Sequence, residues 1–465
     1  MKIAIIGAAG ARTPLIVEAI RLRQQSLGLI ELALMDIDAE TLELIGALIE
    51  PLERKDLTFR VTRTTDLKAA LNSADYVITT FRVGGMAARV VDERVPLSVG
   101  VLGQETTGAG GFAMGMRSIP VLMDIVEVMR QVCPNAWLIN FSNPAGMMAE
   151  AVLRVAGWWR AVGICDGPSS MRHTAATLLQ ASLDEVHLDY FGLNHLGWVR
   201  RVKYQGKDYL PDFIAMIQQA MISEHNSWAG GIPHLPFPPE LIVNLGMIPN
   251  EYLYFYYFRQ QAIQNILNKG QTRGEQILYF NEKLFNSLKR LHKQGNQEGM
   301  MQAYLAYLEQ RQQTYMQTET GGENPTSDSF ENAIAEAASD EGYAGVALDL
   351  IEALHGGRPK ALILNILSQG AIHGMADGDV VEIPAWVSRD AIQPQAVGTV
   401  PGHCLGLMMQ VKEYERLTIA AALEGSYAKA RQALTLHPLV GDYELAKVIL
   451  DGYVEQHGNL FPKLN

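Results

Sequence analysis

Short apolar runs alternate with an amphipathic segment at the start of the chain. Residues 3–6 are rich in isoleucine, and a glycine turn at residues 7–10 follows them at once. Thr13-Pro14 then opens a segment whose apolar residues recur at helical spacing. A second apolar run, residues 30–35, ends at Asp36. This order predicts a dinucleotide-binding βαβ unit, which consists of a strand, a glycine turn, a helix, a second strand and an acidic residue.

The glycine turn and the helix after it would hold the pyrophosphate of a dinucleotide, because backbone N–H groups converge there. Asp36 would accept hydrogen bonds from a ribose diol, and its charge disfavours a 2′-phosphate. The sequence therefore favours NAD over NADP. The turn keeps only part of the full Gly-x-Gly-x-x-Gly pattern, so a Rossmann-like domain without nucleotide is the alternative. The candidate cofactor-binding residues in this unit are Gly7, Ala8, Gly10, Ala11, Arg12 and Asp36.

Further strand-like runs lead into polar or glycine-rich stretches. Residues 75–80 precede Arg82, which lies next to glycines and suits an anion, with an ordinary loop as the alternative. The stretch 103–111 is rich in glycine, which lets backbone approach a ligand closely or serves a mobile lid. Glu105 lies in this stretch, and a solvated glutamate is its alternative. A later run leads to Asn143, whose amide could reach a ligand hydroxyl or cap the next helix.

A thiol, a carboxylate and an imidazole follow two other apolar runs. Residues 161–164 predict a buried strand that ends at Cys165 and Asp166, and residues 186–193 predict one that leads to His195. A thiolate and an imidazole at strand ends suit Zn²⁺, Fe²⁺ or Co²⁺, and an open site filled with hydroxyl oxygens could equally hold Mn²⁺. The alternatives are a buried free cysteine, a helix-capping aspartate and a structural histidine.

The composition changes beyond residue 200. Residues 261–313 predict mostly helix, 414–434 an alanine-rich helix and 443–454 a last helix. The aromatic stretch 251–258 is typical of a core or of an oligomer interface. We expect an α/β fold with a Rossmann-like NAD-binding domain over residues 1–165 and an α+β domain over 166–465. We also expect a homodimer or a homotetramer.

Composition and charge exclude several classes of protein. With 48% apolar and 19% charged residues, the 465-residue chain has ample material for a core. The net charge of −12 argues against a nucleic-acid-binding or anionic-membrane surface. Three scattered cysteines make no disulfide framework. The sequence shows neither a signal peptide nor an apolar run of membrane-spanning length, so we expect a cytoplasmic protein.

Six phrases in a consistent order carry a resemblance to glycoside hydrolase family 4, the NAD- and metal-dependent glycosidases. The resemblance extends from residue 2 to about residue 450, and the branch that it matches most closely is that of the 6-phospho-β-glucosidases. The phrases are Arg82-Val-Gly-Gly85, Asp92-Glu-Arg-Val-Pro96, Gly103-Gln-Glu-Thr106, Asn140-Phe-Ser-Asn-Pro-Ala145, Gly192-Leu-Asn-His195 and Ile248-Pro-Asn-Glu-Tyr252.

The resemblance implies a chemistry and a set of roles. Cys165 and His195 would hold Mn²⁺ or a similar ion, Tyr252 would accept a proton, and Glu105 would make Tyr252 more basic. NAD⁺ would take hydride from sugar carbon C3, Tyr252 would remove the C2 proton, and the aglycone would leave C1 by elimination. Water addition and hydride return would complete a net hydrolysis. The implied substrate-binding residues are Arg89, Asn143 and Asn194, and Arg82 joins the cofactor site.

Three departures from the family pattern leave alternatives open. Asp166 stands where the β-type branch has asparagine, whereas the α-type enzymes carry Cys-Asp with the aspartate as proton donor. The glycine turn differs from the usual Gly-Gly-Gly-Ser. In the segment 338–347, Asp340 and Glu341 lie near the place of a substrate-binding arginine, and a phosphate would be repelled there unless Arg12, Arg82 or Arg89 compensates.

The alternatives within the family are therefore a 6-phospho-α-glucosidase and a glycosidase of unphosphorylated substrates. Outside the family they are a hydroxy-acid dehydrogenase of the lactate/malate type and an inactive NAD-binding sensor.

Overall fold

The computed structural model describes residues 1–53, 57–222, 236–321 and 343–465. Its main sheet has nine strands in the order β13-β12-β11-β6-β5-β4-β1-β2-β3. Strands β1 to β6 pair in parallel, in the order 3-2-1-4-5-6 that defines a dinucleotide-binding Rossmann fold. The expected α/β fold class is thus confirmed. The strands are β1 (Lys2–Ile6), β2 (Glu31–Met35), β3 (Arg60–Thr64), β4 (Tyr76–Thr79), β5 (Trp137–Asn140), β6 (Ala161–Gly163), β11 (Lys360–Leu367), β12 (Val380–Ser388) and β13 (Ala391–Pro394).

The central strands of this sheet are apolar on both faces. Ile5 on β1 pairs with Leu34 on β2 and with Ile78 on β4, and all three side chains are fully buried. Parallel strands covered by helices on both faces require such continuous apolar runs. This is why the runs at 3–6, 30–35 and 75–80 could be found in the sequence.

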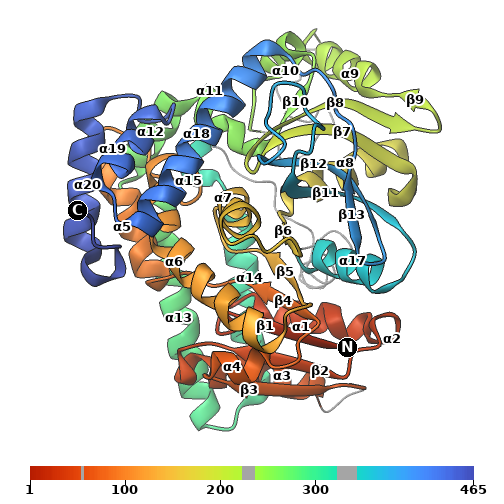
Figure 1. Cartoon of the computed structure of the whole chain (residues 1–465), viewed down its shortest axis with the longest axis vertical. Coiled ribbons are helices and arrows are strands. Elements are labelled where there is room, and N and C mark those ends of the chain that lie inside the picture. Colours follow the sequence, from red (N-terminus) through yellow and green to blue (C-terminus); the bar gives the residue numbers. More distant parts are fainter. Residues whose placement is uncertain (54–56, 223–235, 322–342) are drawn as a thin grey trace.

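Helices cover the sheet and build the rest of the molecule. Figure 1 shows the first three strands in red at the bottom and the last helices in blue at the left, away from them. The helices of the first half are α1 (Thr13–Leu22), α2 (Gln24–Leu27), α3 (Ala39–Glu53), α4 (Leu67–Leu71), α5 (Gly85–Leu97), α6 (Gly108–Val132), α7 (Ala145–Glu150) and α8 (Gly167–Leu179). Those of the second half are α9 (Leu210–Ile222), α10 (Pro239–Leu245), α11 (Tyr254–Tyr257), α12 (Arg259–Lys269), α13 (Arg273–Lys293), α14 (Gln297–Gln313), α15 (Gln317–Thr320), α17 (Tyr343–His355), α18 (Gly402–Glu424), α19 (Tyr427–Leu436) and α20 (Tyr443–His457).

The second half of the chain contributes strands to both sheets of the molecule. Strand β11 pairs antiparallel with β6, so the nine-stranded sheet draws strands from both sides of residue 165. A smaller antiparallel sheet has the order β10-β8-β7, with β9 paired to β8, and its strand β7 packs against β12. The division into domains at residue 165 stays a prediction. The strands of this sheet are β7 (Val186–Leu193), β8 (Leu196–Tyr204), β9 (Lys207–Asp208) and β10 (Ile248–Pro249).

Two segments differ from the pattern expected of them. The alanine-rich stretch 414–434 is not one helix, because Gly425 ends α18 in a left-handed conformation and Ser426 caps α19 by accepting from the Lys429 backbone N–H. The glycine-rich stretch 103–111 is a loop only up to residue 107, where the buried start of α6 takes over. A Cβ on Gly110 would stand 2.1 Å from a backbone oxygen, so close packing explains this glycine.

No helix within the described ranges is long and apolar enough to cross a membrane. Of the segment 338–347, residues 338–342 lie outside the described residues, and Asp340 and Glu341 are among them.

Candidate active site

Polar side chains gather where the central parallel strands end. The carboxyl ends of β1, β4, β5 and β6 share one edge of the sheet, because these strands run in the same direction. Thr79 Oγ1, at the end of β4, donates to Asn140 Oδ1 at the end of β5 over 2.8 Å. The Phe81 backbone N–H donates to the Ser142 hydroxyl over 3.1 Å. These bonds hold the loops after β4 and β5 side by side, at an edge where α/β proteins bind ligands.

Three separate segments bring Cys165, His195 and Tyr252 together. Cys165 follows β6, and His195 lies in the turn between β7 and β8 with a left-handed φ of 62°. Strand β10 pairs with β8, and the Asn250 backbone N–H donates to the Gly197 carbonyl over 2.8 Å. This pairing carries Tyr252, two residues after Asn250, to the His195 turn.

The three side chains lie in direct contact. Cys165 Sγ is 3.4 Å from His195 Nε2. The face of the His195 ring stacks on the Tyr252 ring, with the ring centroids 3.7 Å apart. The structure thus brings together the two expected metal ligands and the expected proton acceptor. In the described part of the chain, no group of three or more His, Cys, Asp or Glu side chains is arranged to hold a metal.

The hydrogen bonds of Thr106 determine which nitrogen of His195 carries the proton. Gln104 Oε1 accepts from the backbone N–H groups of Thr106 and Thr107 and from the Thr106 hydroxyl, at 2.7, 2.9 and 2.9 Å. Because the Thr106 hydrogen is used there, its oxygen accepts from His195 Nδ1–H over 2.9 Å. The lone pair of Nε2 then faces the Cys165 sulfur. Burial lowers the pKa of His195 to about 4, against raising effects of Asp166 and Glu105, so the ring is neutral as a metal ligand requires.

The environment of Cys165 keeps its sulfur protonated in the absence of a cation. Burial, followed by the charge of Asp166, raises the pKa of the Cys165 thiol well above its ordinary value. The Asp166 carboxylate lies 3.8 Å from the sulfur and makes no capping bond to α8. A helix-capping role for this side chain is therefore not what the structure shows. A divalent cation would displace the thiol proton, since metals bind the thiolate.

Glu105 lies between two arginines and is not a solvated side chain. Its Oε2 contacts Arg82 Nη2 and lies 2.8 Å from Arg89 Nη1. Arg89 Nε also donates to Glu93 Oε1 over 2.8 Å, and both of these side chains are buried. Burial alone would raise the pKa of Glu105, but Arg89 and Arg82 lower it to about 2. The two arginines and two glutamates of this cluster balance in charge, and the charge of Arg311 also acts on Glu105.

Two residues beside Tyr252 were not expected from the sequence. The Tyr315 hydroxyl lies 2.7 Å from Glu251 Oε1 and 3.3 Å from the Tyr252 hydroxyl. The Tyr315 hydroxyl is within donating distance of both oxygens and has a single hydrogen to share between them. Burial, then Glu251 and Glu105, raises the pKa of Tyr252, and Tyr315 lowers it. No spacing signal links residues this far apart in the chain, so only the fold reveals the contact.

The expected substrate-binding asparagines lie on neighbouring loops. Asn194 Nδ2 donates to Glu382 Oε1 over 3.2 Å, and Glu382 also accepts from the Tyr190 hydroxyl and Asn365 Nδ2, at 2.7 and 3.0 Å. Burial raises the pKa of Glu382 to about 7, and these three donors oppose the shift. Asn143 follows β5, is partly buried and precedes a cis proline. Glu382 was missed because a lone acid in an apolar strand gives no functional signal.

The glycine turn after β1 forms a second group of residues. The Asp36 carboxylate accepts from the Ala9 backbone N–H over 2.9 Å and so closes the turn against the end of β2. Gly7 has a φ of 94°, and a Cβ there would stand 2.6 Å from the Phe81 backbone nitrogen. Arg82 follows Phe81, so this contact connects the turn to the Glu105 cluster. Among the described residues, and apart from its chain neighbours, a Cβ on the exposed Gly10 would meet only the Gly7 oxygen, 3.5 Å away, so this side of the turn is open.

Family models cover most of the chain. The family 4 glycosyl hydrolase model matches residues 2–181, and the model of that family's C-terminal domain matches residues 190–440. The chain is 32% identical over its full length to a Bacillus subtilis protein named a probable 6-phospho-beta-glucosidase, covering 98% of that protein. It is 31% identical to the 6-phospho-beta-glucosidase of Escherichia coli, with 99% of this chain and 96% of the relative covered.

Solved structures agree over the whole chain. A 6-phospho-beta glucosidase from Thermotoga maritima with NAD and glucose-6-phosphate superposes with a TM-score of 0.83, 27% identity and full coverage of both chains. A 6-phospho-alpha-glucosidase from gut microorganisms with NAD and Mn²⁺ superposes with a TM-score of 0.82 and 28% identity, covering 100% of this chain and 99% of that one. The sequence resemblance is thereby confirmed, and the chain belongs to family 4 of the glycosyl hydrolases.

Proposed function

We propose that this glycosyl hydrolase cleaves 6-phospho-β-glucosides and that it requires NAD and a divalent cation, Mn²⁺ by preference. The observation that carries the proposal is the contact of Cys165 Sγ with the unprotonated Nε2 of His195, beside the stacked ring of Tyr252. Similar proteins support it, since structures of relatives contain NAD, manganese and glucose-6-phosphate.

The residues present fit a divalent cation. Two donors that share one metal ion at 2.0–2.3 Å lie roughly 3–4 Å apart, and the sulfur and nitrogen are 3.4 Å apart. Cys165 and His195 would hold the ion, and the hydrogen bond from His195 to Thr106 would keep the ring in the ligating tautomer. The glycine turn would hold NAD, with Gly7, Ala8, Gly10, Ala11 and Arg12 near its phosphates and Asp36 and Arg82 at its edges.

The chain's own groups would then divide the work on the sugar. When bound, NAD⁺ supplies a hydride acceptor for sugar carbon C3, and the cation polarises the neighbouring oxygens. Tyr252 removes the proton from C2, and its hydroxyl is placed for this by the His195 stack and by Tyr315. Asp166 protonates the glycosidic oxygen as the bond from C1 to that oxygen breaks. Arg89, Asn143 and Asn194 bind the sugar.

One observation favours a second candidate, a 6-phospho-α-glucosidase. The Asp166 carboxylate makes no capping bond and lies beside Cys165, and the family resemblance assigns such an aspartate as proton donor in the α-type enzymes. A phospho-alpha-glucosidase of Clostridium acetobutylicum is 29% identical over the full chain. The cleavage of unphosphorylated glycosides is a further alternative, because the Arg82 and Arg89 side chains are already paired with Glu105.

A panel of aryl glycosides tests the proposal. Purified protein receives α- and β-linked 4-nitrophenyl glucosides, with and without a 6-phosphate, in the presence of NAD⁺, Mn²⁺ and a thiol reductant. We expect release of 4-nitrophenol from the 6-phospho-β-glucoside, without net build-up of NADH, and loss of activity when NAD⁺ is omitted or the metal is chelated. Activity that survives both treatments would overturn the mechanism. Stoichiometric NADH formation from a 2-hydroxy acid would favour the alternative of a hydroxy-acid dehydrogenase. Binding of NAD⁺ without any turnover would favour the alternative of an inactive NAD-binding sensor.

We also propose assembly into a homodimer or homotetramer in the cytoplasm. In the aromatic stretch 251–258, Leu253, Tyr254 and Phe255 are buried within the chain, so this stretch alone does not define an interface. Light scattering of the purified protein measures the assembly state.

A further inference from the structure

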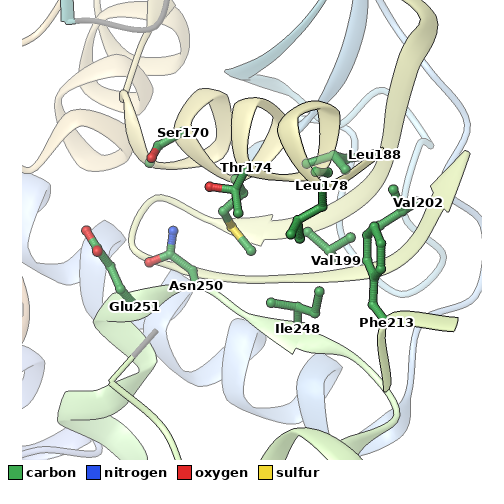
Figure 2. A pocket seen from close by; sticks show the side chains of 13 residues that line it. Ser170, Thr174, Leu178, Leu188, Val199, Val202, Phe213, Ile248, Asn250 and Glu251 are labelled. Carbon is green, nitrogen blue, oxygen red and sulfur yellow. The ribbon is translucent and has the colours of Figure 1, made fainter. Parts of the chain in front are cut away.

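One face of helix α8 lines a pocket next to the candidate active site. The residues of this face recur at intervals of three and four positions, so they form one continuous stripe. Figure 2 shows this helix above the pocket, with side chains of the small antiparallel sheet and its neighbours opposite. The stripe consists of Gly167, Ser170, Met171, Thr174, Ala175 and Leu178, and the facing wall of Leu188, Val199, Val202, Phe213, Ile248, Asn250 and Glu251.

The near end of the pocket belongs to the active site. Gly167 directly follows Asp166, and a Cβ at Gly167 would stand 3.1 Å from Asn250 Nδ2 and 3.8 Å from Cys165 Sγ. Glu251 directly precedes Tyr252. The pocket thus begins at Gly167, one residue after Asp166, which the proposed function assigns to the glycosidic oxygen.

The far end of the pocket is apolar. Leu188, Val202 and Phe213 are buried there, and Leu178 closes the stripe of α8. Glu251 is the one ionisable group among the described lining residues, and it lies at the near end with its carboxylate bonded to Tyr315. From Gly167 to Leu178 the helix rises by roughly 16 Å at about 1.5 Å per residue.

These dimensions and this lining suit an apolar chain or ring better than a sugar. A sugar carries hydroxyl groups on nearly every carbon, and burying a hydroxyl without a partner is unfavourable. The far half of the pocket presents leucine, valine, isoleucine and phenylalanine side chains to an occupant. An alkyl or aryl group would instead replace water on these surfaces, which is favourable.

We propose that this pocket binds the aglycone of the substrate and selects an apolar aryl or alkyl group over a second sugar. The inference rests on the proposed function, because Asp166 marks the glycosidic oxygen only in that reaction. The aglycone would leave C1 at the near end of α8 and extend along the helix toward Phe213 and Leu178.

A series of 6-phospho-β-glucosides that differ only in the aglycone tests the inference. With NAD⁺ and Mn²⁺ present, kcat/KM is compared for methyl, butyl, octyl and glucosyl aglycones. Each methylene that is fully buried in an apolar pocket improves binding by about fourfold. Because burial of the octyl chain is incomplete, we expect the octyl glucoside to exceed the methyl and glucosyl ones by roughly 100-fold. The gain should lie mainly in KM, because the added contacts are the same in ground and transition states.

Substitutions of two neighbouring leucines distinguish the loss of a pocket contact from a general disturbance of α8. Leu178 lines the pocket, whereas Leu179 is partly buried but outside the lining. We expect Leu178→Ser to lower kcat/KM about tenfold for the octyl glucoside and less than twofold for the methyl one. We expect Leu179→Ser to leave the ratio of the two substrates unchanged.

A binding measurement makes the two hypotheses distinguishable. With NADH in place of NAD⁺ the protein cannot accept the hydride, so calorimetry measures the affinities of the octyl and methyl glucosides without turnover. Equal affinities, or a glucosyl aglycone that is cleaved as well as the octyl one, would overturn the aglycone inference while hydrolysis stands. Absence of turnover with every glycoside, together with a preserved octyl preference in calorimetry, would overturn the proposed function instead.

Discussion

The imidazole of His195 lies parallel to the phenol of Tyr252, with the ring centroids 3.7 Å and the ring planes 4° apart. The stack joins the turn between β7 and β8 to the segment after β10, and so it holds the Tyr252 ring against the imidazole that contacts Cys165. Aromatic stacking of this kind needs the ring and not the hydroxyl. A substitution that removes only the Tyr252 hydroxyl therefore tests its role while it leaves the stack in place.

Replacing Tyr252 by phenylalanine should abolish turnover without disturbing the fold. The substitution keeps the stacked ring and removes the proton acceptor, so we expect kcat to fall by about 10²–10⁴-fold, the usual contribution of a general base. The melting temperature and the affinity for NAD⁺ should stay unchanged, because Tyr252 is not among the candidate cofactor-binding residues. Nitrophenol release and a fluorescence titration with NAD⁺ measure the two quantities. Tyr256→Phe, in the same aromatic stretch, is the control and should remain active; a Tyr252→Phe protein with more than a tenth of the activity would contradict the assigned role.

Thr106→Val should weaken the binding of Mn²⁺ about 10- to 100-fold, the usual effect of losing a hydrogen bond to a ligating histidine. Valine has the shape of threonine but cannot accept from His195 Nδ1–H, so the ring would lose the tautomer that leaves Nε2 unprotonated. Titration with Mn²⁺, followed by the paramagnetic resonance signal of the free ion, measures the affinity. Thr107→Val is matched in size and chemistry, and the Thr107 hydroxyl bonds to Gln104 over 3.2 Å. Equal Mn²⁺ affinities of the two variants would rule out a role of Thr106 in metal binding.

Asp166→Asn should affect substrates according to how well their aglycone leaves. A poor leaving group needs a proton as its bond to C1 breaks, whereas 4-nitrophenolate leaves readily without one. We expect kcat/KM to fall about 100-fold for the methyl glucoside and less than tenfold for the nitrophenyl one. Asp184→Asn replaces an exposed carboxylate whose nearest cation, on Arg172, is 3.9 Å away, and it should change neither. A loss of the same size for both aglycones would show that Asp166 does not act as the acid.

The sequence alone was enough to find those site residues that directly follow a buried strand. The runs before Gly7, Arg82, Asn143 and Cys165 are buried parallel strands, and their shared direction alone brings the residues that follow them to one edge. The side chains that support the site could not be found in this way. Tyr315 contacts Glu251 and Tyr252 across more than 60 residues of chain, and Glu382 bonds to Asn194 across 188.

The charged residues of α5 show the same limit. The sequence shows Asp92 and Glu93 only as part of a motif phrase, and both side chains are buried. Asp92 pairs with Arg117 of α6, and Glu93 accepts from the backbone N–H of Gly274 at the start of α13 over 2.6 Å. The partners of Asp92 and Glu93 lie on other helices, so the residue pattern of α5 alone does not reveal that these two charges are buried.

Glu105→Gln should destabilise the protein at neutral pH and remove part of its acid sensitivity. In the folded protein the pKa of Glu105 is lowered to about 2 from an ordinary value of 4.5, and it is the pairing with Arg89 and Arg82 that outweighs burial. A carboxyl group with a lowered pKa stabilises the fold fully above pH 4.5, and this contribution is lost as the pH falls toward 2. We expect the variant to lose roughly 3 kcal/mol of unfolding free energy at pH 7, because two buried guanidinium groups lose their shared partner. Its unfolding free energy should also change less between pH 4.5 and pH 2 than that of the unmodified protein. Urea unfolding followed by circular dichroism measures both effects.

Glu127→Gln, in a surface pair with Arg130, is the control and should change the unfolding free energy by less than about 0.5 kcal/mol. If the two variants were equally stable at pH 7, the Glu105 cluster would contribute no net stability, and its charges would serve the reaction alone.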